Sequence, residues 1–320
     1  MRRWRCRSIA SLAVIASALG ASSIPAVAVE KMIYATFFAD FYAGSKADIW
    51  FMGEVEKRSG GEIKFEKYWA QSLLKAPDLM AGLKSGAADI VNASASVYNV
   101  REFPLSNVMM PYLSTRGDAV MLAWRDLYRN SEDLRRGYES KGTKVLYPFA
   151  WSENSVWSRK PITKIADFKG LKVRAVPPIA EPIARLGATP VALAWAEGIE
   201  ALQRGVVDGV GSTPFDSAVH GGMHEVAKYG NDFGGTGIYS VGVIAIGLDR
   251  YNKLSEKHRK IIDEVAEEMP VQAAKALNAS VDAAVDTTSS LVTSGSMRRT
   301  AHTRLGSIVT RKSAGKLKSM

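Results

Sequence analysis

Cysteine is almost absent from this 320-residue chain, since Cys6 is the only one. It precedes the short apolar run at residues 9–19 instead of ending it, so it is poorly placed to carry a lipid anchor. If residues 1–28 are removed as a signal peptide, the mature protein has no cysteine. Disulfides and cysteine-ligated metal sites are then excluded.

Long hydrophobic runs are missing as well. The run at 9–19 is too short and too rich in alanine and serine to span a membrane, and no later stretch is long enough, so we expect no stable membrane insertion. Four arginines precede the run, Pro25 breaks it, and small residues at 26–28 suit cleavage. The pattern predicts a secretory signal peptide over residues 1–28 and a periplasmic location. The alternative, an amphipathic or core helix, lacks a polar face.

Net positive charge is missing from the body of the chain, although the net charge of the whole chain is +10. Residues 1–28 hold four arginines and no acid, and residues 297–320 hold seven basic residues and no acid, so the residues between them carry a net charge of −1. A body so close to neutral offers no basic groove for phosphates, and we expect no nucleic-acid partner. A nucleic-acid binder that uses only the basic tail is the alternative.

Catalytic motifs are absent from the sequence. It has no nucleophile elbow, no P-loop and no dinucleotide fingerprint. His220 and His224 stand four residues apart, as metal ligands on a helix do, but Gly221 and Gly222 lie between them and no carboxylate pattern completes a site. We therefore expect no catalytic residue, no metal and no cofactor. A secreted hydrolase or lyase is the alternative, and it would need a nucleophile or a metal centre.

Strand and helix patterns alternate in the first part of the chain. Strand patterns cover residues 31–36 and 62–67, and a helix pattern covers about 45–58. A second helix begins near Pro77 and ends at Gly86, after which residues 88–91 resume as a buried strand. This order predicts an α/β lobe over residues 29–150.

A seven-residue pattern occurs twice. Residues 83–89 and 202–208 both read Leu-x-x-Gly-x-x-Asp, each where a helix pattern gives way to a strand pattern. The copies lie too far apart for a solenoid repeat, and they predict two lobes of similar construction, the second over residues 151–236. Coincidence is the alternative, because helix–glycine–strand junctions are common.

The C-terminal third begins with a strand pattern and becomes helical. Residues 237–248 are apolar and glycine-rich, which predicts a strand in a segment, 237–270, that returns to the first lobe. The helical pattern starts at Ser255, and we expect Pro270 to kink or split this helix. Residues 271–295 then continue as a helix that packs across the lobes.

Arg174 lies inside an apolar strand pattern, Leu-Lys-Val-Arg-Ala-Val. A guanidinium in such a place is either paired or faces a wet cleft, and its planar fork matches a carboxylate. A structural salt bridge or a solvated strand face is the alternative to a ligand site. The indoles of Trp151, Trp157 and Trp195 could likewise cover a ligand's apolar part at a cleft edge or simply fill a core.

Three motifs follow one another at close spacing: residues 167–174 (Asp-Phe-Lys-Gly-Leu-Lys-Val-Arg), 186–191 (Leu-Gly-Ala-Thr-Pro-Val) and 200–209 (Glu-Ala-Leu-Gln-Arg-Gly-Val-Val-Asp-Gly). With them the chain resembles, from about residue 30 to 295, the substrate-binding proteins of TRAP transporters, the tripartite ATP-independent periplasmic systems. The resemblance implies a two-lobed, periplasmic-binding-protein-like α/β fold with a ligand cleft between the lobes and a long C-terminal helical region. It also implies that the protein captures a small organic acid and delivers it to TRAP membrane subunits. A periplasmic sensor that presents the ligand to a receptor is the alternative.

The resemblance assigns ligand contacts to two residues of the second lobe. In the family, the arginine that matches Arg174 binds the ligand carboxylate, and the position that matches Trp195 commonly places an aromatic ring against the ligand. Asn154 stands where some members have a second arginine, and Ser212 stands near a position often taken by asparagine, so both are candidate polar contacts. One guanidinium with neutral companions favours a monocarboxylate.

Two further candidates belong to the first lobe. Residues 36–42 form an aromatic-rich loop that lines the cleft in this family, and Phe38 is our candidate from it, with a core position as the alternative. Ser94 follows the strand that begins after Asp89 and faces the same cleft. Together they suggest a ligand with an apolar or ring portion.

The C-terminal tail departs from the family pattern. Family members usually end in helical segments that pack on the body, whereas residues 296–320 are basic and lack amphipathic order. A genuine basic extension and an altered, frameshifted C-terminus both explain this composition.

Overall fold

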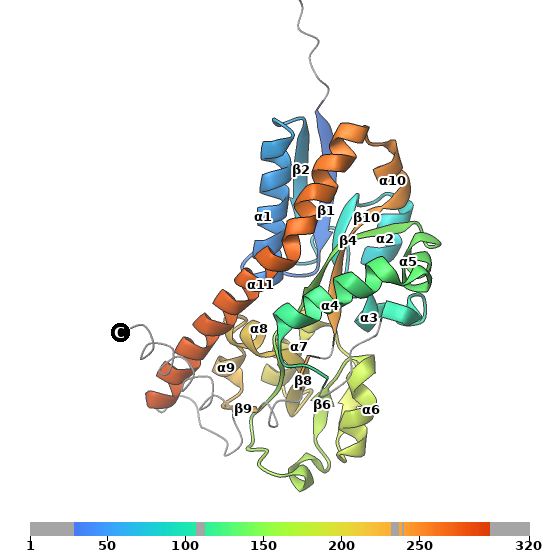
Figure 1. Cartoon of the computed structure of the whole chain (residues 1–320). Coiled ribbons are helices and arrows are strands. Elements are labelled where there is room, and N and C mark those ends of the chain that lie inside the picture. The colour runs from blue at the N-terminus through green and yellow to red at the C-terminus, as the bar shows by residue number, and fades with distance from the viewer. Residues whose placement is uncertain (1–28, 107–112, 232–236, 239, 295–320) are drawn as a thin grey trace, which may run out of the picture.

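The computed structural model describes residues 29–106, 113–231, 237–238 and 240–294. It has two α/β lobes, each built on a five-stranded sheet, and a long helix that runs along both (Figure 1). The expected two-lobed α/β fold with a long C-terminal helix is confirmed. The signal peptide expected at 1–28 and the basic tail at 296–320 lie outside the described residues. Within the described part, no helix is long and apolar enough to cross a membrane.

The sheet of lobe 1 has the strand order β2-β1-β3-β10-β4. Its first three members are parallel to one another, whereas β10 runs antiparallel to both of its neighbours. The strands are β1 (Glu30–Thr36), β2 (Ile63–Tyr68), β3 (Ile90–Ala93), β4 (Thr143–Ala150) and β10 (Val241–Gly247). The strand expected at 237–248 is therefore β10, which lies inside a sheet whose other strands end by residue 150.

Helices cover the sheet of lobe 1. They are α1 (Ala43–Arg58), α2 (Leu79–Ser85), α3 (Ala95–Tyr98), α4 (Gly117–Asn130), α5 (Glu132–Glu139) and α10 (Leu248–Lys253), with 3₁₀ turns η1 (Ala76–Asp78) and η2 (Pro104–Ser106). The apolar side of α1 buries Phe51, Met52 and Val55 in the core of this lobe. The burial of such side chains is the main source of stability for the lobe.

A buried acid lies in this core. The Asp48 carboxylate accepts hydrogen bonds from the Asn92 amide at 2.6 Å, from the Tyr147 hydroxyl at 2.7 Å and from the Tyr34 hydroxyl. Burial raises the pKa of Asp48 to about 6, and the three hydrogen bonds oppose that rise by favouring the charged form. Lobe 1 therefore contains a titratable group close to neutral pH.

Lobe 2 repeats the α/β plan with the strand order β7-β6-β8-β5-β9. Its strands are β5 (Asn154–Ser158), β6 (Lys172–Arg174), β7 (Thr189–Val191), β8 (Gly209–Pro214) and β9 (Tyr229–Asn231). Its helices are α6 (Pro177–Arg185), α7 (Trp195–Gln203), α8 (Phe215–His220) and α9 (Met223–Val226), preceded by the turn η3 (Ile165–Phe168). The parallel strands β7, β6 and β8 correspond to β2, β1 and β3 of lobe 1.

The repeated Leu-x-x-Gly-x-x-Asp pattern has the same structure in both lobes. Gly86 and Gly205 both adopt a left-handed conformation, with φ of 78° and 74°, where α2 and α7 end. The aspartate that follows accepts a hydrogen bond from the neighbouring parallel strand: Asp89 from the Ile33 amide at 2.7 Å, and Asp208 from the Lys172 amide at 2.9 Å. The glycine ends the helix and the aspartate ties the next strand to the sheet, which explains the recurrence.

The helix α11 (Glu256–Thr293) contacts α1, α4 and β4 of lobe 1 and α8 of lobe 2 (Figure 1). We expected Pro270 to kink or split it, and the split does not occur, because one helix continues through this residue. Proline removes one backbone hydrogen bond there, but Met269, Pro270 and Ala273 are all buried. Packing on both sides of the proline therefore holds the two halves together.

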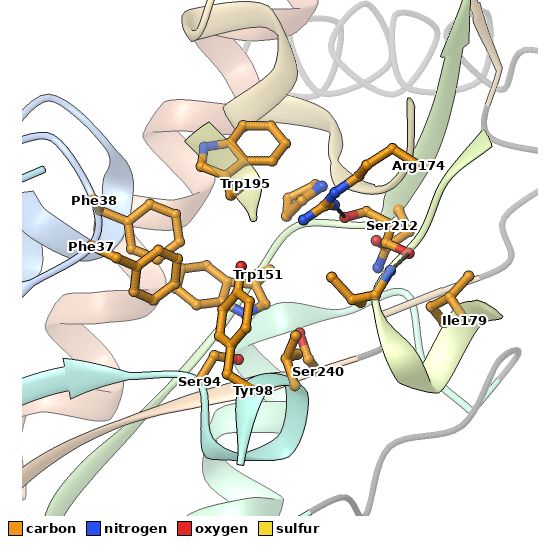
Figure 2. A pocket seen from close by; sticks show the side chains of 14 residues that line it. Phe37, Phe38, Ser94, Tyr98, Trp151, Arg174, Ile179, Trp195, Ser212 and Ser240 are labelled. Atoms are coloured by element: carbon orange, nitrogen blue, oxygen red, sulfur yellow. Dashed lines mark hydrogen bonds between the residues drawn. The ribbon is translucent and has the colours of Figure 1, made fainter. Parts of the chain in front are cut away.

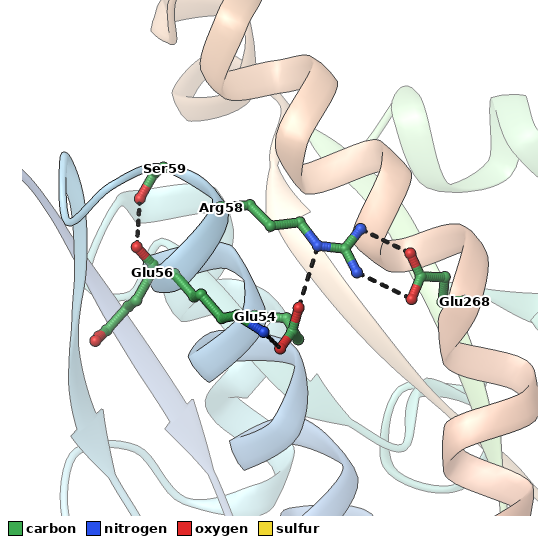
Figure 3. Close-up of polar contacts among 6 residues, drawn as sticks. Glu54, Glu56, Arg58, Ser59 and Glu268 are labelled. Atoms are coloured by element: carbon green, nitrogen blue, oxygen red, sulfur yellow. Dashed lines mark hydrogen bonds and ion pairs between the residues drawn. The ribbon is translucent and has the colours of Figure 1, made fainter.

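A charged cluster on the surface joins α11 to α1 (Figure 3). The Arg58 guanidinium donates from Nη1 and Nη2 to the two carboxylate oxygens of Glu268, at 2.6 and 3.0 Å, and from Nε to Glu54 at 3.2 Å. Because these groups are partly exposed to water, they fix the orientation of the two helices more than they stabilise the fold.

Candidate functional site

A cavity of about 520 Å³, open solvent at its mouth included, lies between the two lobes. The six residues proposed from the sequence all line it: Phe38, Ser94, Asn154, Arg174, Trp195 and Ser212 (Figure 2). The structure thus brings together residues of β5, β6, β8 and α7 with residues from the segments that follow β1 and β3.

Arg174, the last residue of β6, is only 1% exposed. Its Nε donates to the main-chain carbonyl of Leu193 at 3.0 Å, and its Nη1 donates to the carbonyls of Gly211 and Ser212, both at 3.2 Å. Carbonyls fix the plane of the guanidinium but carry no charge to balance it. The side chain is therefore held in place before any anion arrives.

No acidic side chain in the described part of the chain forms an ion pair with Arg174. Glu197 raises the pKa of this guanidinium through its charge, but its Oε2 accepts a hydrogen bond from the Ala194 amide. Burial is the larger effect and lowers the pKa of Arg174 from its usual value. A structural salt bridge, one of the alternatives given above, is thus not what this arginine makes, and an anion in the cavity would complete its partners.

Aromatic rings form the wall that lobe 1 contributes. The rings of Phe37 and Phe38 lie 3.9 Å apart between centroids, and Phe38 lies 4.7 Å from Trp151. Phe37, Phe38 and Trp151 all belong to the apolar core of lobe 1 and also line the cavity. The sequence left a core position and a cavity-wall position open as alternatives for Phe38, and this residue therefore occupies both.

Trp151 keeps its place because a glycine faces it. A Cβ atom added to Gly242 would lie 3.0 Å from Cζ2 of the indole, which is tighter than nine in ten real Cβ contacts, so the indole would have to shift by a few tenths of an ångström. The absence of a side chain at Gly242, on β10, thus leaves room for the indole beside the cavity.

Trp195, at the start of α7 in lobe 2, packs with the core of lobe 1. The centroid of its ring lies 6.0 Å from Cζ of Arg174, which is the limit of a cation–π contact. Its ring also meets the ring of Tyr42 of lobe 1 edge-on, with 6.5 Å between the centroids. Trp195 therefore touches both the guanidinium and the opposite lobe.

Two polar side chains in the cavity have hydrogen-bonding capacity to spare. The Ser94 hydroxyl is buried and has no hydrogen-bond partner among the described residues. Asn154 is 6% exposed, and among the described residues its Nδ2 donates only one long hydrogen bond, of 3.4 Å, to the Gly237 carbonyl. An unsatisfied buried hydroxyl is costly, so a polar group of a ligand beside Ser94 would be favoured.

Ser212 adopts a backbone conformation that is rare for a residue with a side chain, with φ of 52°. This conformation directs its carbonyl to Arg174, and its hydroxyl accepts from the Val176 amide at 3.4 Å. Left-handed non-glycine residues concentrate at functional sites, where surrounding structure maintains the strain. The main chain of Ser212 is thus used to position Arg174.

Tyr98, on α3, is a cavity residue that sequence reasoning missed (Figure 2). Its ring meets the ring of Phe37 edge-on, with 5.6 Å between the centroids, and the charge of the nearby Arg174 guanidinium opposes the rise in the pKa of Tyr98 that burial causes. A signal was present, because α3 follows the carboxyl end of the parallel strand β3, which is where α/β folds bind ligands.

Comparison with known proteins gives a consistent family. The family model described as bacterial extracellular solute-binding protein, family 7, matches residues 44–299. The ectoine-binding periplasmic protein TeaA of Halomonas elongata is 28% identical over 233 residues, which cover 71% of this chain and 67% of that protein. A solute-binding protein of Albidiferax ferrireducens is 32% identical over 224 residues, which cover 68% of this chain and 64% of that protein. The match thus spans about two thirds of each relative.

Solved structures agree with this family. A TRAP solute-binding protein of Rhodoferax ferrireducens, in complex with copurified benzoate, has a TM-score of 0.70 and 25% identity, and the match covers 80% of this chain and 82% of that one. The relatives are named as solute-binding and periplasmic proteins, and none of these names is that of an enzyme.

Proposed function

Because the chain belongs to family 7 of the bacterial extracellular solute-binding proteins, the binding proteins of TRAP transporters, we propose that it captures a small organic monocarboxylate between its lobes. The observation that carries this proposal is Arg174: a buried guanidinium, positioned by three carbonyls and without an acidic partner in the described residues. A carboxylate accepts charge-assisted hydrogen bonds from such a fork.

The walls of the cavity support a ligand with a ring or another flat apolar portion. Phe37, Phe38, Trp151 and Trp195 would contact this portion, and Ser94, Asn154 and Ser212 would serve its polar groups. With one guanidinium in the cavity, a second carboxylate would be buried without a charged partner, so a monocarboxylate is favoured. The benzoate complex of the related Rhodoferax protein makes benzoate a suitable first probe.

Delivery and location follow from the same proposal. We propose that residues 1–28 direct export to the periplasm. We also propose that the two lobes close on the ligand and present it to TRAP membrane subunits. Lobe 1 comprises residues 29–150 and 237–270, lobe 2 comprises residues 151–236, and the helix at 271–295 packs across both. Mass spectrometry of the exported protein tests the first step, since it should begin at Val29. A protein that retains residues 1–28 in the cell envelope would contradict it.

The binding proposal is tested by calorimetry and thermal shift with benzoate and a panel of organic acids. A ligand at 100 times its dissociation constant should add about 2.7 kcal/mol of stability. Arg174→Ala should lose roughly 2–5 kcal/mol of binding free energy, the range for a buried charge that loses its partner, and Arg174→Lys should recover only part of it because lysine lacks the planar fork.

The matched control is Arg185→Ala. Arg185 is an exposed arginine on α6, in the same lobe, and pairs with Glu181 outside the cavity, so its loss should leave the affinity unchanged. Unchanged affinity in Arg174→Ala would remove this residue from the site, and a dicarboxylate that binds far more tightly than every monocarboxylate would overturn the predicted class.

A further inference from the structure

The helix α8 of lobe 2 is held at its amino end, close to where the chain first crosses between the lobes. The buried Asp216 carboxylate, in the first turn of α8, accepts hydrogen bonds from the Ser152 hydroxyl at 2.5 Å and from the Ser280 hydroxyl at 2.6 Å. Ser152 lies between β4 of lobe 1 and β5 of lobe 2, and Ser280 belongs to α11. Because three segments meet at one buried carboxylate, α8 cannot shift without breaking these bonds.

At the other end of α8, Gly221 lies against a tyrosine of lobe 1. A Cβ atom added to Gly221 would lie 2.9 Å from the Tyr42 hydroxyl oxygen, closer than real Cβ contacts come, and 3.0 Å from the carbonyl oxygen of Ser217, one turn earlier. The backbone of Gly221 has a φ of −77°, which any residue can adopt, so its conformation does not require glycine. The missing side chain instead lets the hydroxyl of the opposite lobe approach the end of α8.

Tyr42 has little room to give way, because it is only 8% exposed and other rings surround it. The centroid of its ring lies 4.4 Å from that of Phe41 and 5.5 Å from that of Phe38. On the side of lobe 2 it meets the ring of Trp195 edge-on at 6.5 Å. Phe38 and Trp195 both line the ligand cavity. A group that displaced Tyr42 would therefore press on the cavity wall, since a packed interior transmits strain.

Building on the binding function proposed above, we propose that Tyr42 and Gly221 are positioning residues for the ligand. Their contact sets how closely lobe 1 approaches α8, and it acts on the ligand through Trp195, whose ring lies between Tyr42 and the Arg174 guanidinium, 6.5 Å from the first and 6.0 Å from the second. The absence of a Cβ atom at residue 221 is thus a requirement for ligand affinity and not only for packing inside lobe 2.

The first test is calorimetry with benzoate on the wild type, Gly221→Ala, and Gly221→Ala combined with Tyr42→Phe. Gly221→Ala adds a methyl group beside the Tyr42 hydroxyl, so benzoate should bind roughly fivefold to hundredfold more weakly, the range for an extra methyl group in a packed interior. The double variant lacks the hydroxyl, and the other atoms of residue 42 lie 3.4 Å or more from the added Cβ. Its affinity should therefore return to within about twofold of the wild type, the usual scatter of such comparisons.

Two single variants serve as controls. Tyr42→Phe keeps the ring that packs on Trp195, so it should bind benzoate as the wild type does. Gly53→Ala, on α1 of lobe 1, adds its methyl group where nothing lies within 4 Å, and it should also leave the affinity unchanged. Wild-type affinity in Gly221→Ala overturns the proposal. A double variant as weak as Gly221→Ala also overturns it, because the Ser217 carbonyl and not Tyr42 would then be the cause.

The second test measures the approach of the lobes without ligand. Residues 29–320 contain no cysteine, so spin labels at Lys57→Cys, near the end of α1, and at Glu225→Cys, on α9, report the distance between the lobes, and both positions are exposed. Gly221→Ala should lengthen this distance, and adding Tyr42→Phe should restore it, whereas an unchanged distance in Gly221→Ala contradicts the proposal. If the wild type binds no carboxylate at all, the binding function fails, and this distance still decides whether the contact sets the approach of the lobes.

Discussion

The buried carboxylate of Asp48 makes the stability of lobe 1 depend on pH in a direction opposite to that of most carboxylates. Its pKa rises from 3.8 to about 6 in the folded protein because burial disfavours the charged form. The folded state therefore holds a proton that the unfolded chain has released between these two values. The stability contributed by Asp48 is fully present below about pH 4 and is lost as the pH rises through about 6.

The magnitude follows from the shift. About two pKa units correspond to roughly 3 kcal/mol, which is an order-of-magnitude value for a group buried to this extent. Asp48→Asn cannot titrate, so subtracting its pH profile from that of the wild type isolates this contribution and cancels the exposed carboxylates. Urea unfolding followed by tryptophan fluorescence between pH 4 and 7.5 gives both free energies of unfolding.

The difference in unfolding free energy between the wild type and Asp48→Asn should fall by about 3 kcal/mol from pH 4 to 7. Tyr147→Phe provides a second comparison, because the Tyr147 hydroxyl donates to Asp48 and favours its charged form. Without it the pKa of Asp48 should rise further, and the fall should extend to higher pH. A wild-type profile parallel to that of Asp48→Asn would refute the reasoning, since Asp48 would then titrate equally in both states.

Three other predictions concern single residues. Ser212→Gly should keep or slightly raise the melting temperature, whereas Ser212→Val should lower the free energy of unfolding by about 1–2 kcal/mol, the usual cost of a left-handed conformation. Equal melting temperatures of the two variants would contradict this. Gly242→Ala should push the Trp151 indole toward the cavity and weaken benzoate binding in calorimetry, and unchanged affinity would show that the wall adapts. Asp208→Ala should lower the free energy of unfolding in urea by about 1–3 kcal/mol, because the Lys172 amide loses its charged acceptor. A loss below about 0.5 kcal/mol would show that the aspartate of the repeated motif does not hold the strand to the sheet.

The parts of the fold that follow from periodicity were accessible from the sequence. The helix expected at about 45–58 is α1, and the strands expected at 31–36 and 62–67 are β1 and β2, within one or two residues. The helix α4 was not predicted: its exposed Leu122 and Leu127 lie among its charged residues and blur the apolar stripe on which such predictions depend. Pairing of β10 between β3 and β4 depends on contacts distant in sequence, which no local pattern encodes.

The candidate site was predicted by a different route. An arginine in an apolar strand was conspicuous, but only the family motifs gave Arg174 a ligand role, and Asn154, Ser212 and Ser94 came from the same resemblance. The structure places them around one cavity. Tyr98 was missed because α3 has only four residues, too few to show periodicity, and because the Arg174 guanidinium near it belongs to the other lobe. The side chains that meet across the cleft depend on how the two lobes are placed relative to each other, and local sequence patterns do not give this placement.

The position of β10 sets the order in which the chain can assemble. Among the described strands β4 has one neighbour in its sheet, β10, and β10 follows β4 by the whole length of lobe 2. While the chain emerges amino end first, all the strands of lobe 2 are available before β10 appears, whereas β4 must wait without a hydrogen-bonded partner. The closure of this long loop is entropically unfavourable and slow compared with local pairing. The lobe that begins first along the chain therefore finishes last.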